Sequence, residues 1–159
     1  MKLARVFPTK TNMSPTDQDA YFGVPDLFTP KGHYVEIHIS TTFTWDIPKA
    51  EALARAWAGY GKVLIGGPAY GDPGSEFVSG RYLKSGVTIT SRGCPNKCGF
   101  CFVPKREGKT RELPIVEGNV IQDNNILACS KPHYDSVIQM LKKQRQVEFA
   151  GGLEAVRIT

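Results

Sequence analysis

Three cysteines lie close together in the second half of the chain. They are Cys94, Cys98 and Cys101, in the run Gly-Cys-Pro-Asn-Lys-Cys-Gly-Phe-Cys. These spacings let one loop fold back so that three thiolates converge on a single centre, as soft sulfur ligands do around an iron-sulfur cluster or zinc. A closed zinc site and an ordinary cluster carrier both use four protein ligands. Three cysteines therefore predict a metal centre with one open position.

Other interpretations of these cysteines remain open. Cys129 or His133 could complete a structural zinc site, or the three thiols could stand reduced in a tight turn. Cys129 as a fourth cluster ligand would suit an electron-transfer protein. We favour the open cluster because the ligand pairs of a zinc site are normally spread over two knuckles.

The spacing Cys-x3-Cys-x2-Cys, with the aromatic Phe100 directly before the last cysteine, resembles the signature of the radical S-adenosylmethionine superfamily. The resemblance implies that Cys94, Cys98 and Cys101 hold a 4Fe-4S cluster whose remaining iron binds S-adenosylmethionine. It implies reduction of that cofactor, by an electron donor such as flavodoxin or ferredoxin, to a 5'-deoxyadenosyl radical that abstracts hydrogen from a substrate. No residue is assigned to the substrate.

A polar run interrupts an apolar strand that we expect between residues 119 and 129. Asp123, Asn124 and Asn125 belong to this run. They match, by order along the chain, the strand end where the radical S-adenosylmethionine family binds the amino group of the cofactor. The resemblance therefore implies a cofactor-binding role for these three residues, and a plain polar turn is the alternative.

A third strand is expected at residues 147–150, directly before Gly151 and Gly152. Paired glycines let a ligand or another backbone approach closely. Glu154 follows them and could accept a hydrogen bond from an ammonium group or a ribose hydroxyl. The family resemblance implies that these residues, together with Phe100, line the cofactor cleft.

The pattern of the N-terminal half predicts a parallel βαβ unit. Residues 34–39 alternate as in a strand, with Val35, Ile37 and Ile39 on one face. A helix follows from residue 46 or 47 to Gly59, and a short buried strand covers residues 62–65. We also expect a strand at residues 3–7 and a long loop over residues 9–31.

Residues 1–85 are thus expected to form a small, Rossmann-like α/β region. Through residues 42–48 and 65–69 this region resembles a reduced form of the cobalamin-binding-like domain that precedes the barrel in one branch of the family. An Asp-x-His-x-x-Gly motif is missing from the sequence, so cobalamin is not predicted. His33 and His38 are expected to be surface or strand histidines.

Residues 86–159 are expected to form the N-terminal half of a radical S-adenosylmethionine (β/α) partial barrel. A strand at residues 87–90 should deliver the cysteine loop at its C-terminal end, where parallel α/β folds place their chemistry. Ser130 is expected to cap a helix that has His133 at its surface. About half of such a barrel is present, so we expect either a longer parent chain or a partner that supplies the rest.

The formal net charge of the chain is +5 at pH 7, and the excess lies around the cysteines. The basic loop, residues 92–111, contains one acid, Glu107, and six bases: Arg92, Lys97, Lys105, Arg106, Lys109 and Arg111. Such a loop either is simply solvated or contacts nucleic acid. The alternative function is therefore a non-enzymatic module, stabilised by zinc or a cluster, that binds nucleic acid through this loop.

The sequence predicts a cytoplasmic protein without membrane contact. Its apolar runs are far shorter than the roughly 20 residues that a membrane helix needs. The N-terminal segment is too short and too interrupted to serve as a signal peptide. A reducing compartment also suits unpaired cysteines that bind metal.

Overall fold

The computed structural model of the chain describes residues 2–74 and 76–154, and all statements below concern these residues. The chain divides into two compact units, an N-terminal unit, Met1–Asp72, and a C-terminal unit, Pro73–Thr159. Both units are of mixed α/β structure. The predicted α/β class is therefore confirmed.

The division between the units lies earlier in the chain than the expected boundary between residues 85 and 86. Pro73 and Gly74 belong with the C-terminal unit because the guanidinium of Arg111 holds them there. Its Nη2 donates to the carbonyl of Pro73 at 3.0 Å and to that of Gly74 at 3.2 Å. Pro73 and Gly74, which the expected N-terminal region included, thus pack with the cysteine-bearing unit.

A sheet of four parallel strands, in the order β2-β1-β3-β4, forms the centre of the N-terminal unit. The strands are β1 (Leu3–Val6), β2 (Ala20–Tyr21), β3 (Glu36–Ser40) and β4 (Lys62–Gly66). Helix α1 (Ile47–Ala56) connects β3 to β4. The predicted parallel βαβ unit is therefore confirmed.

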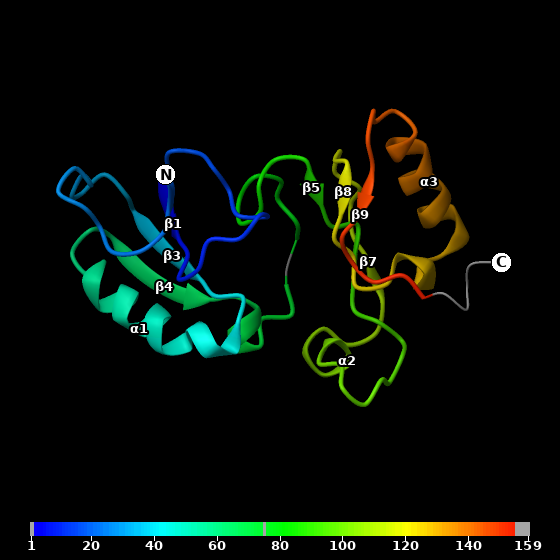
Figure 1. The fold of residues 1–159 in the computed structure, drawn as a ribbon, viewed down its shortest axis with the longest axis horizontal. Helices are drawn as coiled ribbons and strands as arrows, with labels where there is room; N and C mark the ends of the chain where they lie inside the picture. The colour runs from blue at the N-terminus through cyan, green and yellow to red at the C-terminus, as the bar shows by residue number, and fades with distance from the viewer. Residues whose placement is uncertain (1, 75, 155–159) are drawn as a thin grey trace. The chain divides into compact units, whose positions relative to one another are not determined.

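Helix α1 lies along one face of this sheet (Figure 1). Pro48 fits its first turn, where a missing N–H costs nothing. Trp57, directly after the helix, is fully buried, and its indole N–H donates to the carbonyl of Gly23 at 3.0 Å. The core between helix and sheet consists of Ala4, Val6, Tyr34, Ile37, Ile39, Ala50, Leu53 and Trp57.

The expected alternation of residues 34–39 is wrong at its N-terminal end. Val35 is 48% exposed, whereas Tyr34 is buried. The hydroxyl of Tyr34 donates to Asp19 Oδ1 at 2.9 Å and lies 2.7 Å from the hydroxyl of Tyr21. Burial and these hydrogen bonds raise the pKa of Tyr34. Tertiary partners, rather than strand periodicity, therefore decide which side chain turns inward before β3 begins.

The segment that we expected to be a long loop contains strand β2. Arg5 of β1 is buried and pairs with Asp17, and the ring of Tyr21 meets that of Trp57 edge-on at 4.8 Å. These contacts order the segment against the sheet. A strand of two residues carries no periodicity, so the sequence pattern could not reveal it.

The C-terminal unit contains a sheet of three parallel strands that follow each other in chain order, β5-β8-β9. They are β5 (Val87–Thr88), β8 (Val120–Ile121) and β9 (Glu148–Phe149). A separate antiparallel pair joins β6 (Ser91–Arg92) to β7 (Arg111–Glu112). The three strands expected for this half of the chain are therefore present, each shorter than expected.

Two helices belong to this unit, the short α2 (Val103–Arg106) and α3 (Lys131–Leu141). Ser130 caps α3 as predicted, because its hydroxyl accepts from the backbone N–H of His133. Helix α3 covers the sheet through a core of Ile121, Ile126, Val137 and Leu141 (Figure 1). Short 3-10 turns complete the two units: η1 (Thr44–Asp46), η2 (Pro68–Tyr70) and η3 (Ile126–Ala128).

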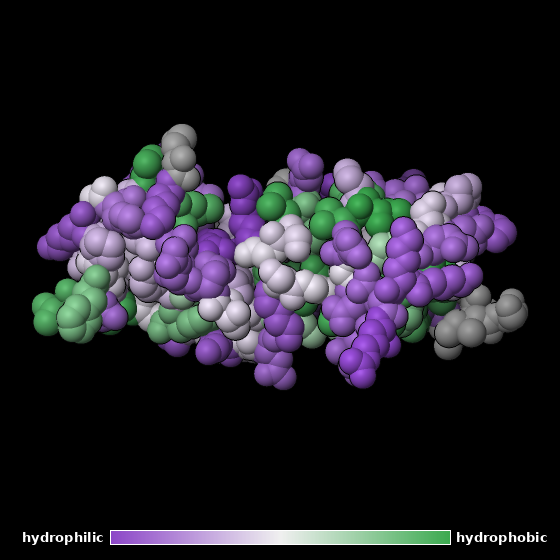
Figure 2. Space-filling model, turned by 90° about the horizontal axis from the view of Figure 1, so that it is seen from above, coloured by the Kyte–Doolittle hydropathy of each residue, from purple (hydrophilic) through white to green (hydrophobic). Residues whose placement is uncertain are grey.

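The helices of the described residues are short, and α3 is the longest with 11 residues. None of them has the length and apolar character that crossing a membrane requires. Figure 2 shows hydrophilic side chains interspersed with hydrophobic ones on the face that it presents.

Candidate metal and cofactor site

The cysteine loop, residues 93–101, leaves the C-terminal end of β6. Its first cysteine is fixed by a backbone bond, because the N–H of Cys94 donates to the carbonyl of Gly108 at 3.1 Å. Cys98 and Cys101 belong to one turn, in which the N–H of Cys101 donates to the carbonyl of Cys98 at 3.0 Å. All three thiols are free, with Cys98 exposed and the other two partly buried.

Gly93 fixes the start of the loop. Its N–H donates to Asn124 Oδ1 at 3.0 Å and lies 3.3 Å from Glu107 Oε2. Its φ is +81°, and a Cβ atom at this position would lie 2.2 Å from the carbonyl oxygen of Lys109. Only glycine fits this backbone without displacing the neighbouring chain. Asn124 and Glu107 therefore hold the position from which Cys94 projects.

Glu107 is the single acid of the basic loop, and its side chain is almost fully buried between two arginines. Arg106 pairs directly with one carboxylate oxygen, and Nη1 of Arg92 lies 3.9 Å from the other. Burial lowers the pKa of Arg92, and the charge of Glu107 opposes that effect. Removing one member of such a buried group would leave an uncompensated charge. Sequence reasoning missed this role, although a lone acid among six bases was its signal.

Asp123 lies beneath the loop and is 2% exposed. Its Oδ1 accepts from the backbone N–H of Thr90 at 2.6 Å, and its Oδ2 accepts from the hydroxyls of Thr90 at 2.7 Å and Ser91 at 2.6 Å. Both carboxylate oxygens are thus engaged in joining the end of β8 to Thr90 and to Ser91, the first residue of β6. The structure places Asp123 in the support of the site, away from solvent.

Asn125 brings together residues from three separate segments. Its Nδ2 donates to Glu154 Oε2 at 3.0 Å and lies 3.7 Å from Cys94 Sγ. The residue is 3% exposed, and its Oδ1 has no hydrogen-bond partner within the described part of the chain. A buried amide oxygen without a donor costs about 1–3 kcal/mol. This corner, made of Cys94, Asn125 and Glu154, therefore suits a ligand that brings an N–H group.

Gly151 and Gly152 let two strand ends approach closely. The N–H of Gly152 donates to the carbonyl of Asp123 at 3.0 Å. A Cβ atom on Gly151 would lie 1.9 Å from the carbonyl oxygen of Asp123, and one on Gly152 would lie 2.2 Å from that of Asn124. The glycines thus bring Glu154 to Asn125 by close backbone packing. Ala155, which follows, lies outside the described residues.

The remaining residues expected at the site are not gathered there. Phe100 is 89% exposed on the loop. Across residues 2–74 and 76–154, no group of three or more His, Cys, Asp or Glu side chains is arranged to hold a metal ion. The donor set itself fits a soft metal centre, since three free thiols share one loop. The three thiols thus do not converge on one point in the described structure.

Comparisons with known proteins add no relative to this picture. No family model, curated protein or solved structure matches the chain. The function therefore has to follow from the residues of the site and from the resemblance of the cysteine motif.

Cys129 follows η3 and is partly buried. Burial raises the pKa of its thiol, the charges of Asp123 and Glu112 act in the same direction, and a hydrogen bond from Ser91 acts against them. Metals bind the thiolate, so a thiol that is held protonated is a poor ligand. These surroundings disfavour Cys129 as the fourth ligand of a zinc or cluster site.

His133, the other candidate for a fourth ligand, was also expected to be a surface residue. That expectation is wrong, because the side chain is only 9% exposed. Its Nδ1 lies 3.8 Å from Glu112 Oε2, and its Nε2 is buried without a partner in the described residues. The first turn of α3 turns this histidine inward toward β7, which the helical pattern alone did not indicate.

Cys129 is expected to react with iodoacetamide more slowly than the exposed Cys98 in the metal-free chain. Only the thiolate attacks, and a raised pKa lowers the thiolate fraction at every pH below it. The rate profile of Cys129 should therefore lie at higher pH in the folded chain than in urea, where the rates of the two cysteines should converge. Mass spectrometry of alkylated peptides over a pH series measures this. An unchanged profile for Cys129 upon unfolding would contradict the assignment.

The six bases of the basic loop divide into two groups. Arg92 and Arg106 pair with Glu107, and Arg111 donates to backbone carbonyls, so the three arginines are engaged within the unit. The three lysines, Lys97, Lys105 and Lys109, are exposed. Four exposed bases, the three lysines and Arg111, therefore present charge to solvent, whereas Arg92 and Arg106 are paired with Glu107.

Proposed function

We propose that the chain is a radical S-adenosylmethionine protein that holds a 4Fe-4S cluster on Cys94, Cys98 and Cys101. The observation that carries the proposal is the corner at which Cys94, Asn125 and Glu154 meet. Three separate segments supply these residues, and each was expected at the site from the cysteine motif and the order of strand ends. Three thiols that shared a loop only by chance would give no reason for these three segments to come together at one point.

The arrangement of the C-terminal unit supports the same proposal. Strands β5, β8 and β9 are parallel and neighbour each other in chain order, as successive strands of a (β/α) barrel do. The site residues follow the C-terminal ends of these strands, where such folds bind their ligands. We therefore propose that this unit is the N-terminal half of a partial barrel, preceded by a Rossmann-like unit.

Each residue of the site then has a role. The three thiolates would hold the cluster, and the carboxylate of Glu154 and Oδ1 of Asn125 would accept hydrogen bonds from the ammonium group of S-adenosylmethionine. Phe100 would cover the loop once the thiols converge. When bound, cluster and cofactor supply the radical chemistry, and the electron would come from a flavodoxin or ferredoxin type of donor.

Glutamine at position 154 is expected to weaken binding of S-adenosylmethionine about tenfold or more, because a hydrogen bond to a charged group contributes roughly 1.5–3 kcal/mol. Iron content should stay unchanged, since Glu154 is not a cluster ligand in the proposal. The test is anaerobic reconstitution of the full chain, followed by titration of its visible absorption with the cofactor. Glu117→Gln, which changes an exposed carboxylate that accepts a hydrogen bond from Gln144 at 3.0 Å, is the matched control.

Two results would overturn the proposal. One is a colourless protein that retains a single zinc and has no affinity for S-adenosylmethionine. The other is cofactor binding that Glu154→Gln and Glu117→Gln weaken equally, because the corner at Cys94 would then have no part in it. The first result would favour the metal-stabilised module, whose nucleic-acid binding a gel-shift titration would then test.

A further inference from the structure

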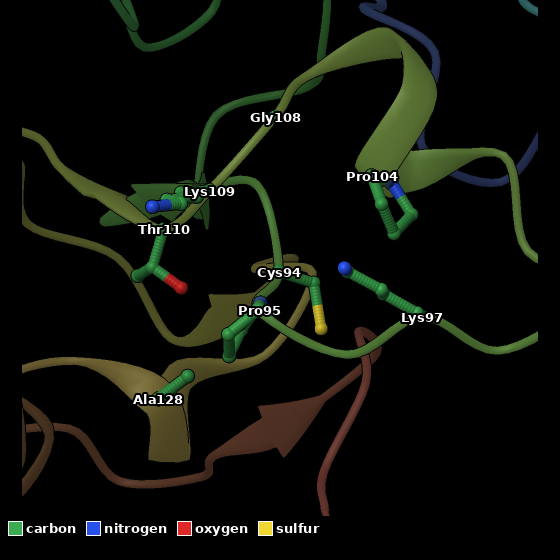
Figure 3. Close-up of a pocket in the computed structure, with 8 residues that line it drawn as sticks. All are labelled: Cys94, Pro95, Lys97, Pro104, Gly108, Lys109, Thr110 and Ala128. Carbon is green, nitrogen blue, oxygen red and sulfur yellow. The ribbon is translucent and has the colours of Figure 1, made fainter.

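A hollow of about 400 Å³ opens beside Cys94 in the C-terminal unit. This volume lies within the range of small-molecule sites, about 300–1,000 Å³. Neither Cys98 nor Cys101 is among its lining residues, so the hollow is separate from the part of the loop that carries these two thiols. The lining residues are Cys94, Pro95, Lys97, Pro104, Gly108, Lys109, Thr110 and Ala128 (Figure 3).

The charged side chains that line this hollow are all positive. The lining contains two lysines and no acidic residue. The acid nearest in sequence, Glu107, is buried in its pairs with Arg92 and Arg106 and does not line the hollow. A concave wall that carries only positive charge attracts anions and raises their local concentration.

Thr110 adds a hydroxyl group, which can donate a hydrogen bond in a defined direction. Its Oγ1 is buried and has no hydrogen-bond partner within the described residues. Figure 3 shows this hydroxyl turned toward Cys94 and Pro95, with the side chain of Lys97 extending toward Cys94 from the other side. Lys109 directs its ammonium group away from Cys94 in the same view. Lys97 and Thr110 thus line the hollow on either side of Cys94, and Lys109 adds a further positive charge to the lining.

We propose that this hollow binds a small oxoanion, the phosphate or carboxylate of a substrate, between the ammonium group of Lys97 and the hydroxyl of Thr110. The hydroxyl would donate to an anionic oxygen, which gives the buried Oγ1 the partner that it lacks. A small anion suits the site better than a polynucleotide, since a nucleic-acid interface neutralises many phosphates and this hollow is lined by only two cations.

An anion bound in this hollow would lie next to Cys94 and therefore beside the proposed metal centre. A phosphate or carboxylate held here would fix one end of a substrate beside the metal centre, and this role as a substrate handle rests on the proposed function. The anion site itself does not, because it is made of residues that need no cluster. The two ideas can therefore fail separately.

The test is an NMR titration of the full chain, metal-free and under reducing conditions, with inorganic phosphate at constant ionic strength. We expect saturable shifts of the amides of residues 108–110 and of Lys97. Thr110→Val should weaken phosphate binding roughly tenfold, the effect of losing a hydrogen bond to a charged group. Lys97→Gln should weaken it about threefold, as for an exposed charge pair. Lys105→Gln, an exposed charge outside the hollow, should leave it unchanged.

Acetate, titrated in the same way, distinguishes the two sources of the anion. Tighter binding of phosphate assigns a phosphorylated substrate, and tighter binding of acetate assigns a carboxylic acid. The proposal is overturned if neither anion produces saturable shifts at the hollow, or if Lys105→Gln weakens binding as much as Lys97→Gln does. The second result would show general attraction to a basic surface. Neither result depends on cluster assembly or on S-adenosylmethionine.

Discussion

Serine in place of Cys94, Cys98 or Cys101 is expected to reduce the iron and sulfide bound after anaerobic reconstitution several-fold. Each substitution removes one of three thiolates, and a serine hydroxyl is not ionised at neutral pH. Cys129→Ser should leave the iron content unchanged, because the thiol of Cys129 is partly buried with a raised pKa. Iron and sulfide analysis, with the electron paramagnetic resonance signal of the reduced protein, measures the outcome.

The four serine variants control for one another, because they make the same chemical change within one unit. Loss of iron in Cys129→Ser to the extent seen in Cys98→Ser would show four cysteine ligands and favour an electron-transfer protein. Loss of iron in His133→Gln would point instead to a mixed site. Either result would remove the open position on which binding of S-adenosylmethionine depends.

Alanine in place of Asp123 is expected to lower the free energy of unfolding of the C-terminal unit by about 3–5 kcal/mol, the usual cost of breaking a buried charged group. The carboxylate accepts three hydrogen bonds from Thr90 and Ser91, and both residues are fully buried. Its removal leaves these donors without partners and without access to water. Urea unfolding followed by amide hydrogen exchange of residues 87–92 reports on this unit separately.

Asp135→Ala is the matched control for this measurement. Asp135 lies in the same unit and forms an exposed pair with Lys131 one helical turn away. Such pairs contribute only about 0.3–0.5 kcal/mol. If Asp123→Ala destabilises the unit no more than Asp135→Ala does, the hydrogen bonds of the buried carboxylate do not support the loop. Asp123→Asn should fall between the two, since an amide keeps one acceptor and the approximate shape.

Local signals were sufficient to predict helices α1 and α3 and the parallel unit. Pro48 in the first turn of α1 and Ser130 at the cap of α3 act within a few residues of their own positions, so the sequence shows them directly. The side chain of Tyr34 behaves otherwise. Its inward position depends on Asp19 and Tyr21, which reach it through the fold and leave no trace in a window of the sequence.

The sequence identified the polar residues that lie near the cysteine loop, but it did not show which contact each of them makes. Asp123, Asn124 and Asn125 are equally polar and consecutive, yet they support a strand junction, the start of the cysteine loop and the corner at Cys94, respectively. Which of the three faces inward depends on the backbone after β8, and one residue of shift would exchange the roles. Spacing identifies such a set of residues, and only tertiary structure assigns each member.

The two hydrogen bonds of the Gly93 N–H hold one end of the cysteine loop more firmly than the other. Because Asn124 and Glu107 both accept from the N–H of Gly93, the backbone that leads into Cys94 is held at two points, whereas Cys98 lies exposed farther along the loop. If the proposed cluster is bound, Cys94 would hold it from a position that the fold already fixes, and Cys98 would be the ligand open to solvent.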